Sequence, residues 1–176
     1  MKTLRTYEDF KAIVFHKKQV AISKEAKHLI EESYNFLKEF ANDKIIYGVN
    51  TGFGPMAQYR IEPEDQLQLQ YNLIRSHASG CGEVFDIKTV RAAILCRLNS
   101  LSLGKSGVHI EAIELMRDLL NYRITPLIFQ HGGVGASGDL VQLALLALVL
   151  IGEGEVFYKG LRRPTAEVFA EVGIKP

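Results

Sequence analysis

The sequence predicts a mainly α-helical protein with minor β content. Apolar residues recur at helical spacing along most of the chain, and residues that favour helix starts precede these stretches. Two glycine-rich segments, residues 47–55 and 131–138, interrupt the helical pattern and are predicted to be loops. With 176 residues, of which 47% are hydrophobic and 23% charged, the chain is long and apolar enough to bury a core.

The first half of the chain contains three predicted helices. Ser23 is a favourable cap for a helix whose apolar positions recur at helical spacing as far as Ala41. After the first glycine-rich segment, Pro63 opens a second helix, because proline suits the first helical turn. Asp86 then caps a third helix that runs to Leu101.

The second half combines two helices with short extended pieces. A fourth helix is predicted from Ser106, an extended piece at Thr125–Phe129, and a nearly all-apolar helix after Asp139. A short strand is predicted at Glu155–Tyr158, followed by a charged tail. A helix that is apolar all round must be covered on every side. Because residues 152–176 cannot cover it, we expect further chain or other subunits to pack there.

Composition excludes several classes of function. The formal net charge of +1 gives no bulk attraction for nucleic acid or for an acidic membrane surface. No apolar run approaches the roughly 20 residues that a bilayer span needs, and no signal peptide is recognisable. Two cysteines do not make a disulfide framework, and the histidines show no metal-ligand spacing. We therefore expect a soluble cytoplasmic protein without a metal.

The glycine-rich segment from Gly132 to Asp139 allows three interpretations. Gly133, Gly135 and Gly138 satisfy the G-x-G-x-x-G pattern of dinucleotide-binding proteins. However, no alternation of strands and helices precedes it, and no acidic residue ends the next predicted strand. A phosphate-binding P-loop needs a lysine where Asp139 stands, and a carboxylate there would repel phosphate.

In the third interpretation, Ala136, Ser137 and Gly138 condense with one another. The amide nitrogen of Gly138 attacks the carbonyl carbon of Ala136, and loss of water closes a five-membered ring. Ser137 then loses a second water and leaves an exocyclic methylidene. The product is a strong electrophile that no standard side chain supplies, and the flanking glycines permit the tight bend it requires. Because Ala-Ser-Gly is a common tripeptide, these three residues alone do not establish the reaction.

Four stretches of the chain are similar to known motifs. They are YGVNTGFG at 47–54, QYNLIRSHASG at 70–80, RLNSLSLGKSG at 97–107 and GGVGASGDLVQL at 132–143. In this order they resemble the motifs of the aromatic amino-acid ammonia-lyases, which include histidine, phenylalanine and tyrosine ammonia-lyases. The resemblance covers essentially the whole chain and is closest to the flavobacterial branch of tyrosine ammonia-lyases. One departure is Val141-Gln142-Leu143, where the family commonly has Ala-Pro-Leu.

The resemblance implies a fold and a catalytic apparatus. The fold is the N-terminal portion of the L-aspartase-like helical fold. Residues 1–105 are expected to form an N-terminal domain with a mobile active-site loop, and residues 106–176 to begin a long-helix domain. The resemblance implies that Ala136-Ser137-Gly138 forms the 4-methylidene-imidazol-5-one electrophile (MIO). It also implies that Tyr47 is the base that takes the β-proton.

The resemblance further implies residues that bind substrate. Ser76 and His77 match the substrate-selecting pair, and Gly54 is expected beside the substrate as well. The pair Ser-His is typical of histidine ammonia-lyases, whereas the overall match favours tyrosine. An imidazole can donate or accept a hydrogen bond, so His77 suits either substrate. The residues that would let the active-site loop close are Gly48, Asn50, Gly52 and Gly54.

The implied reaction is non-oxidative deamination of L-tyrosine to p-coumarate, or of L-histidine to urocanate, with release of ammonia. Members of the family are much longer and act as homotetramers, so this chain is expected to be an N-terminal fragment that is inactive alone. An aminomutase, which uses the same electrophile but returns the amine to the β-carbon, is an open alternative. A nucleotide-binding or structural module is the alternative from another class.

Overall fold

The computed structural model describes residues 6–134 and 140–176, which form seven α-helices, one 3-10 helix and five short strands. The helices are α1 (Tyr7–Val14), α2 (Lys24–Phe40), η1 (Gly54–Met56), α3 (Pro63–His77), α4 (Ile87–Leu101), α5 (Ile110–Tyr122), α6 (Leu140–Leu150) and α7 (Thr165–Val172). The strands are β1 (Cys81–Val84), β2 (Thr125–Pro126), β3 (Phe129–His131), β4 (Glu155–Tyr158) and β5 (Leu161–Pro164). The prediction of a mainly helical chain with minor β content is confirmed.

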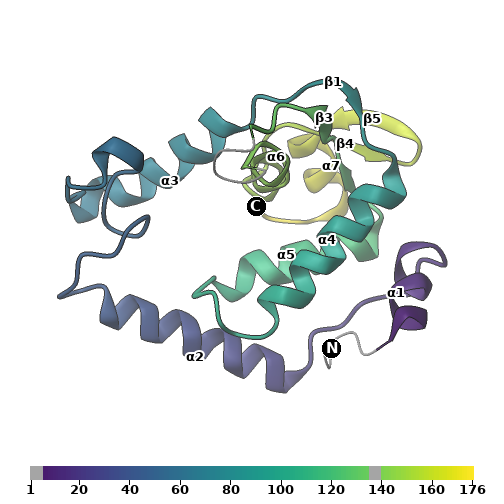
Figure 1. Cartoon of the computed structure of the whole chain (residues 1–176). Coiled ribbons are helices and arrows are strands. Elements are labelled where there is room, and N and C mark those ends of the chain that lie inside the picture. Colours follow the sequence, from purple (N-terminus) through teal and green to yellow (C-terminus); the bar gives the residue numbers. More distant parts are fainter. Residues whose placement is uncertain (1–5, 135–139) are drawn as a thin grey trace.

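The core lies around α4, which packs against α1 and α5 (Figure 1). Ile94, Leu95 and Leu98 on α4 are completely buried, as is Leu119 on α5. Their spacing along α4 places them on one helical face, which explains how this helix covers two neighbours at once. Two small antiparallel sheets extend the core, β1–β3 and β2–β4–β5.

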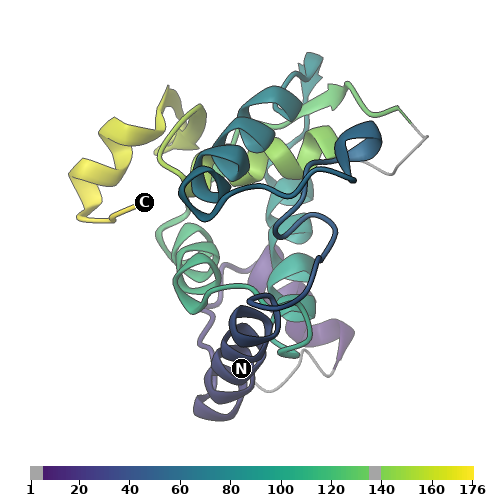
Figure 2. The ribbon, with the colours of Figure 1, turned by 90° about the vertical axis from the view of Figure 1, so that its left-hand side faces the viewer.

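The helices α2 and α3 lie at different ends of the molecule. In Figures 1 and 2, α2 runs along one edge, whereas α3 lies beside α6 on the opposite side. The segment 41–62 connects them and includes the first glycine-rich stretch. This arrangement leaves the connecting segment at the periphery, where it has few neighbours beyond its own residues.

A buried arginine joins three helices. Arg91 on α4 is only 5% exposed, and its guanidinium donates to the carbonyl oxygens of Leu120 (3.0 Å) and Ile13 (3.1 Å). These oxygens lie in the last turns of α5 and α1, where the helix dipole places partial negative charge. Burial, and then the charge of Arg123, lower the pKa of Arg91. Two helix-end carbonyl oxygens thus accept the hydrogen bonds of the buried guanidinium, a role that a carboxylate often has.

Local sequence signals placed several helix starts correctly. The Ser23 hydroxyl accepts from the Ala26 amide, and Asp86 accepts from the amides of Lys88 and Thr89. The fourth helix begins at Ile110 rather than near Ser106 as predicted. The left-handed backbone of Gly107 (φ 61°) and the cap at His109 delay its start.

Two regions contain structure that the sequence analysis did not predict. Helix α1 forms after Thr6, whose hydroxyl caps it by accepting from the Asp9 amide. The expected charged tail instead forms β5 and α7, because Lys159 and Gly160 both adopt positive φ and turn the chain into a hairpin with β4. The predicted strand Glu155–Tyr158 is confirmed as β4.

Helix α6 is not covered on every side by this chain. Val141, Leu145 and Leu146 are buried, but Leu140 and Leu143 are each 45% exposed. Part of its apolar surface is therefore open among the described residues, as the composition of this helix led us to expect. The division at residue 105 stays a prediction, and α4 and α5 on either side of it pack against each other.

Candidate active site

Tyr47 lies on the peripheral segment between α2 and α3 and is 63% exposed. The backbone N–H of Gly54 donates to its hydroxyl oxygen at 3.1 Å. Its ring meets the Phe53 ring edge-on, with 6.0 Å between the ring centres. The side chain is thus held by the loop itself, and its hydroxyl hydrogen is free to bond elsewhere.

The glycines of this loop are required for different structural reasons. Gly48 and Gly54 adopt positive φ (76° and 54°), which glycine accepts without strain. Gly52 is needed for space instead, because a Cβ there would lie 2.6 Å from the carbonyl oxygen of Met56. The loop therefore depends on glycine both for its bends and for the close approach of η1.

Ser76 and His77 form the last residues of α3. The Ser76 hydroxyl donates to the carbonyl oxygen of Leu73 at 3.0 Å, and Nδ1 of His77 lies 2.9 Å from the same oxygen. Nδ1 also lies 3.1 Å from the Ser76 hydroxyl oxygen. Because a carbonyl oxygen can only accept, the shorter contact with Leu73 favours the tautomer that carries its ring hydrogen on Nδ1. In the neutral ring, Nε2 of His77 is then left as a hydrogen-bond acceptor.

The two-stranded ladder β1–β3 connects this end of α3 to the second glycine-rich segment. Cys81 pairs with His131, and Val84 with Phe129. Gly80 permits the pairing, since a Cβ there would lie 2.9 Å from Cβ of Phe129 and 3.1 Å from Leu145. The ladder places the residues that follow His77 next to those that lead into the segment carrying the Ala-Ser-Gly triad.

Ala136, Ser137 and Gly138 lie outside the described residues, whereas both flanks of their segment are described. Gly132 (φ 132°) precedes it and Val141 follows it. A Cβ on Gly132 would lie 2.9 Å from the Val141 side chain and 3.1 Å from Cα of Gly80. The two described flanks of the segment therefore lie close together.

An ion pair joins the two helices that flank this region. Arg75 on α3 donates from Nε and Nη2 to the carboxylate of Glu153, which follows α6, with a shortest distance of 2.5 Å. The Arg75 guanidinium also lies over the Tyr71 ring. The hydrogen bond from Arg75 lowers the pKa of Glu153, and the same contact raises the pKa of Arg75. The pair is half exposed, so it orients α3 more than it stabilises the fold.

The structure does not bring Tyr47 and His77 together. The segment 41–62, which carries Tyr47, leads into the N-terminal end of the 15-residue helix α3, whereas His77 is the last residue of this helix (Figure 1). At 1.5 Å per residue, this helix is about 20 Å long. With this separation, Tyr47 and His77 of one chain are too far apart to contact the same substrate molecule.

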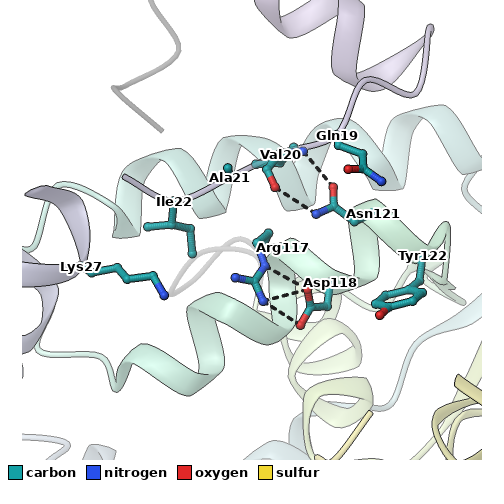
Figure 3. Close-up of a pocket in the computed structure, with 9 residues that line it drawn as sticks. All are labelled: Gln19, Val20, Ala21, Ile22, Lys27, Arg117, Asp118, Asn121 and Tyr122. Atoms are coloured by element: carbon teal, nitrogen blue, oxygen red, sulfur yellow. Dashed lines mark hydrogen bonds and ion pairs between the residues drawn. The ribbon is translucent and has the colours of Figure 1, made fainter. Parts of the chain in front are cut away.

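A separate pocket of about 510 Å³ lies between α5 and the residues that precede α2 (Figure 3). Asn121 exchanges two hydrogen bonds with the backbone of Val20 (2.8 and 2.9 Å), and Arg117 pairs with Asp118. Lys27 pairs with Glu114 nearby. The charged groups at this pocket are thus already paired, and none of the predicted site residues lines it. This pocket is therefore a packing gap between residues 19–22 and α5.

The described residues contain neither a metal-binding cluster nor a membrane-spanning helix. In residues 6–134 and 140–176, no group of three His, Cys, Asp or Glu side chains could hold a metal ion. No helix in the same ranges is long and apolar enough to cross a membrane. The dinucleotide interpretation lacks its parallel βαβ unit, because β3 and β4 pair antiparallel with β1 and β2 respectively.

The sequence analysis missed how strongly Asn50 and Thr51 are bound into the loop. Asn50 is 3% exposed and Thr51 1% exposed, although Tyr47 and Met56 in the same loop are largely exposed. The Asn50 side chain bonds to the backbone at three positions, and Thr51 bridges to Arg60. A polar pair between glycines gives no hydropathy signal, so nothing in the pattern indicated burial.

Known structures share this arrangement of elements. The ergothionase from Treponema denticola is 30% identical and superimposes with a TM-score of 0.93, over 99% of this chain and 35% of the ergothionase. Tyrosine aminomutase from Streptomyces globisporus is 35% identical with a TM-score of 0.87, over 96% of this chain and 32% of the aminomutase. The fold is thus the N-terminal portion of the ammonia-lyase and aminomutase fold.

Sequence comparison agrees with this fold. The family described as aromatic amino acid lyase matches residues 5–176. Histidine ammonia-lyase from Geobacillus sp. (strain WCH70) is 46% identical over 172 residues, which are 97% of this chain and 34% of the relative. The chain belongs to the aromatic amino acid lyase family. It spans about a third of the length of the curated relatives it matches.

Proposed function

We propose that this chain provides the N-terminal part of an ammonia-lyase that removes ammonia from an aromatic L-amino acid, with L-histidine as the substrate. The observation that carries the proposal is the β1–β3 ladder in a member of this family. It ties the segment that follows His77 to the segment that carries Ala136-Ser137-Gly138. A substrate-selecting residue and an electrophile must lie near each other to act on one substrate.

The choice of substrate rests on two observations, of which the first disfavours phenylalanine and the second favours histidine. Nε2 of His77 is an acceptor in the neutral ring, so it suits a substrate ring that donates a hydrogen bond. Histidine and tyrosine have such a donor and phenylalanine has none. The relative with 46% identity is a histidine ammonia-lyase. We therefore favour histidine over tyrosine, in agreement with the Ser-His pair, although the overall resemblance of the sequence favoured tyrosine.

The flanks of the second glycine-rich segment fit an MIO group. Ring closure needs a tight bend, and Gly132 and Val141 are in contact on either side of the segment. Residues Ala136, Ser137 and Gly138 would form the group. When formed, it supplies an electrophile that activates the substrate for loss of its amine. No metal is needed for this chemistry.

Tyr47 is proposed as the base. Elimination breaks the Cβ–H and Cα–N bonds and forms a Cα=Cβ double bond, while the amine leaves as ammonia. The phenolate oxygen of Tyr47 takes the β-proton. Because Tyr47 and His77 lie at opposite ends of α3, we propose that Tyr47 serves the site of another subunit in a homotetramer. The substrate is the only other partner proposed, and neither nucleic acid nor a membrane is involved.

The test uses this chain fused at its C-terminal end to the part of the Geobacillus relative that lies beyond the match, called here the assembled enzyme. Purified assembled enzyme is incubated with L-histidine, L-tyrosine or L-phenylalanine, and ammonia and the unsaturated acid are measured. The proposal predicts urocanate and ammonia from L-histidine, with much less product from the other two. Preferential release of p-coumarate would refute the choice of histidine, and a Tyr47→Phe variant with full activity would refute the base.

An aminomutase is the second candidate, because solved aminomutases share the fold at 35% identity. The product distinguishes the two. A lyase releases ammonia in equal amount to the unsaturated acid, whereas an aminomutase yields a β-amino acid. A cytoplasmic location is proposed on the support of two free, exposed cysteines, Cys81 and Cys96, which fit a reducing compartment.

A further inference from the structure

Asn50 is a buried amide in a loop whose large side chains are mostly exposed. Its exposed fraction is 3%, whereas Ile45 is 73% exposed, Tyr47 63% and Met56 55%. A buried amide without partners would destabilise the fold, so its hydrogen bonds decide what it does. All of them are made to the backbone of its own loop and of the adjoining helix end.

The Asn50 side chain closes the turn that contains Tyr47. Its Oδ1 accepts from the backbone N–H of Ile46 at 2.8 Å, and the Asn50 N–H donates to the Ile46 carbonyl at 3.2 Å. Ile46 and Asn50 thus exchange two hydrogen bonds around residues 47–49. Within this ring, the Gly48 N–H donates to the Thr51 hydroxyl at 3.3 Å. The backbone of Tyr47 is therefore held from both sides.

The same side chain fixes the turn to the rest of the molecule. Nδ2 of Asn50 donates to the carbonyl oxygens of Lys44 (2.7 Å) and Ala41 (3.1 Å), and Ala41 caps the C-terminal end of α2. On the other side, the Ile61 N–H donates to the Asn50 carbonyl at 3.0 Å, just before α3. Asn50 is thus the point where α2, the Tyr47 turn and the approach to α3 meet.

We propose that Asn50 is a positioning residue, whose side chain holds the backbone of Tyr47 in the geometry needed for proton removal. The inference rests on the proposed role of Tyr47 as the base. Asn50 does not need to touch substrate, because it acts on the turn that carries the base. Displacement of a catalytic group by about 1 Å can lower a rate by about a hundredfold, which is the size of effect expected from losing this clamp.

Two substitutions separate the clamp from a general effect on the loop. Asn50→Asp keeps the size of the side chain and the acceptor for Ile46, but it replaces two donors by an oxygen facing two carbonyl oxygens. The matched control is Asn42→Asp, the same change at an exposed position of the same segment. Asn50→Ala removes every side-chain hydrogen bond at once.

Hydrogen–deuterium exchange on the chain as it stands tests the clamp independently of any activity. Both Asn50 variants lose the bonds from Nδ2 to Ala41 and Lys44, which hold the turn to the end of α2. The turn then opens more often, so the amides of Ile46 and Ile61 are expected to exchange at least about tenfold faster in both variants than in the Asn42→Asp control. The α4 and α5 amides are expected to be unchanged in all variants. Equal exchange at Ile46 and Ile61 in variant and control would overturn the proposal.

The assembled enzyme tests the catalytic consequence. Asn50→Asp is expected to lower kcat by about a hundredfold with little change in KM, whereas the control stays within about twofold. In a Tyr47→Phe background, Asn50→Asp is expected to cost nothing further, because it acts through Tyr47. A multiplicative loss in the double variant would overturn the positioning role. If Tyr47→Phe alone leaves activity intact, the proposed function of Tyr47 fails, while the exchange result still decides the clamp.

Discussion

Substitution of Gly80 by alanine tests how the β1–β3 ladder joins the end of α3 to the second glycine-rich segment. It does not adopt a left-handed backbone, so an alanine there is opposed only by lack of space. The added Cβ would lie 2.9 Å from Cβ of Phe129, 3.1 Å from Cδ1 of Leu145 and 3.2 Å from the His131 carbonyl oxygen. Two of these contacts involve atoms at or next to the backbone, which cannot rotate away, so β1 and β3 must move apart.

Such overpacking costs about 2 kcal/mol of unfolding free energy. For a chain of 176 residues, this corresponds to a decrease in Tm of about 4–8 °C. Thermal unfolding followed by far-UV circular dichroism measures it, with Ser79→Ala as the control at an exposed neighbouring position. The control is expected to melt within about 1 °C of the parent chain. If Gly80→Ala melts together with the control, the close packing of the ladder is wrong, and with it the link between His77 and the Ala-Ser-Gly segment.

Three further outcomes are expected. Arg91→Met leaves two buried helix-end carbonyls without a donor and should cost about 2 kcal/mol in denaturant unfolding, whereas Arg97→Met on the exposed side of α4 should cost little. The hydrogen bond from the Thr89 hydroxyl lowers the pKa of the Asp86 carboxyl, so Asp86 stabilises the fold above the ordinary carboxyl pKa, and this stability is lost as pH falls through the lower folded value. The Tm difference between the parent chain and Asp86→Ala should therefore shrink below about pH 4, and a constant difference would contradict this. Gly52→Ala should displace η1 and speed chymotrypsin cleavage of the loop, and unchanged cleavage would argue against the close approach there.

Features of the fold that depend on neighbouring residues were predictable from the sequence. Ser23 and Asp86 cap their helices through amides two or three residues away, and Pro63 begins α3 as its conformation favours. The start of the fourth helix was misplaced because Ser106 looks like a cap, whereas the left-handed Gly107 prevents a helix there. The capping preference of Ser106 was outweighed by the turn at Gly107, which the spacing of apolar residues does not indicate.

Features that depend on distant contacts were not predictable. The burial of Asn50 follows from bonds that reach back to the end of α2, and its sequence neighbours carry no sign of them. The need for glycine at position 80 arises from Phe129, which is 49 residues away in the sequence but adjacent in space. The roles of Tyr47, Ser76 and His77 came from the resemblance of motifs. The structure adds the partners of each side chain, and those roles stay predictions.

The central claim is that Ala136, Ser137 and Gly138 form an electrophilic ring in an ammonia-lyase. The most direct measurement is the mass of the proteolytic peptide that spans residues 130–142 of the folded assembled enzyme, compared with the mass calculated from the sequence. The account predicts a deficit of two water molecules, located by fragmentation to residues 136–138, and its loss in a Ser137→Ala variant. An unmodified mass in the folded assembled enzyme would contradict the claim.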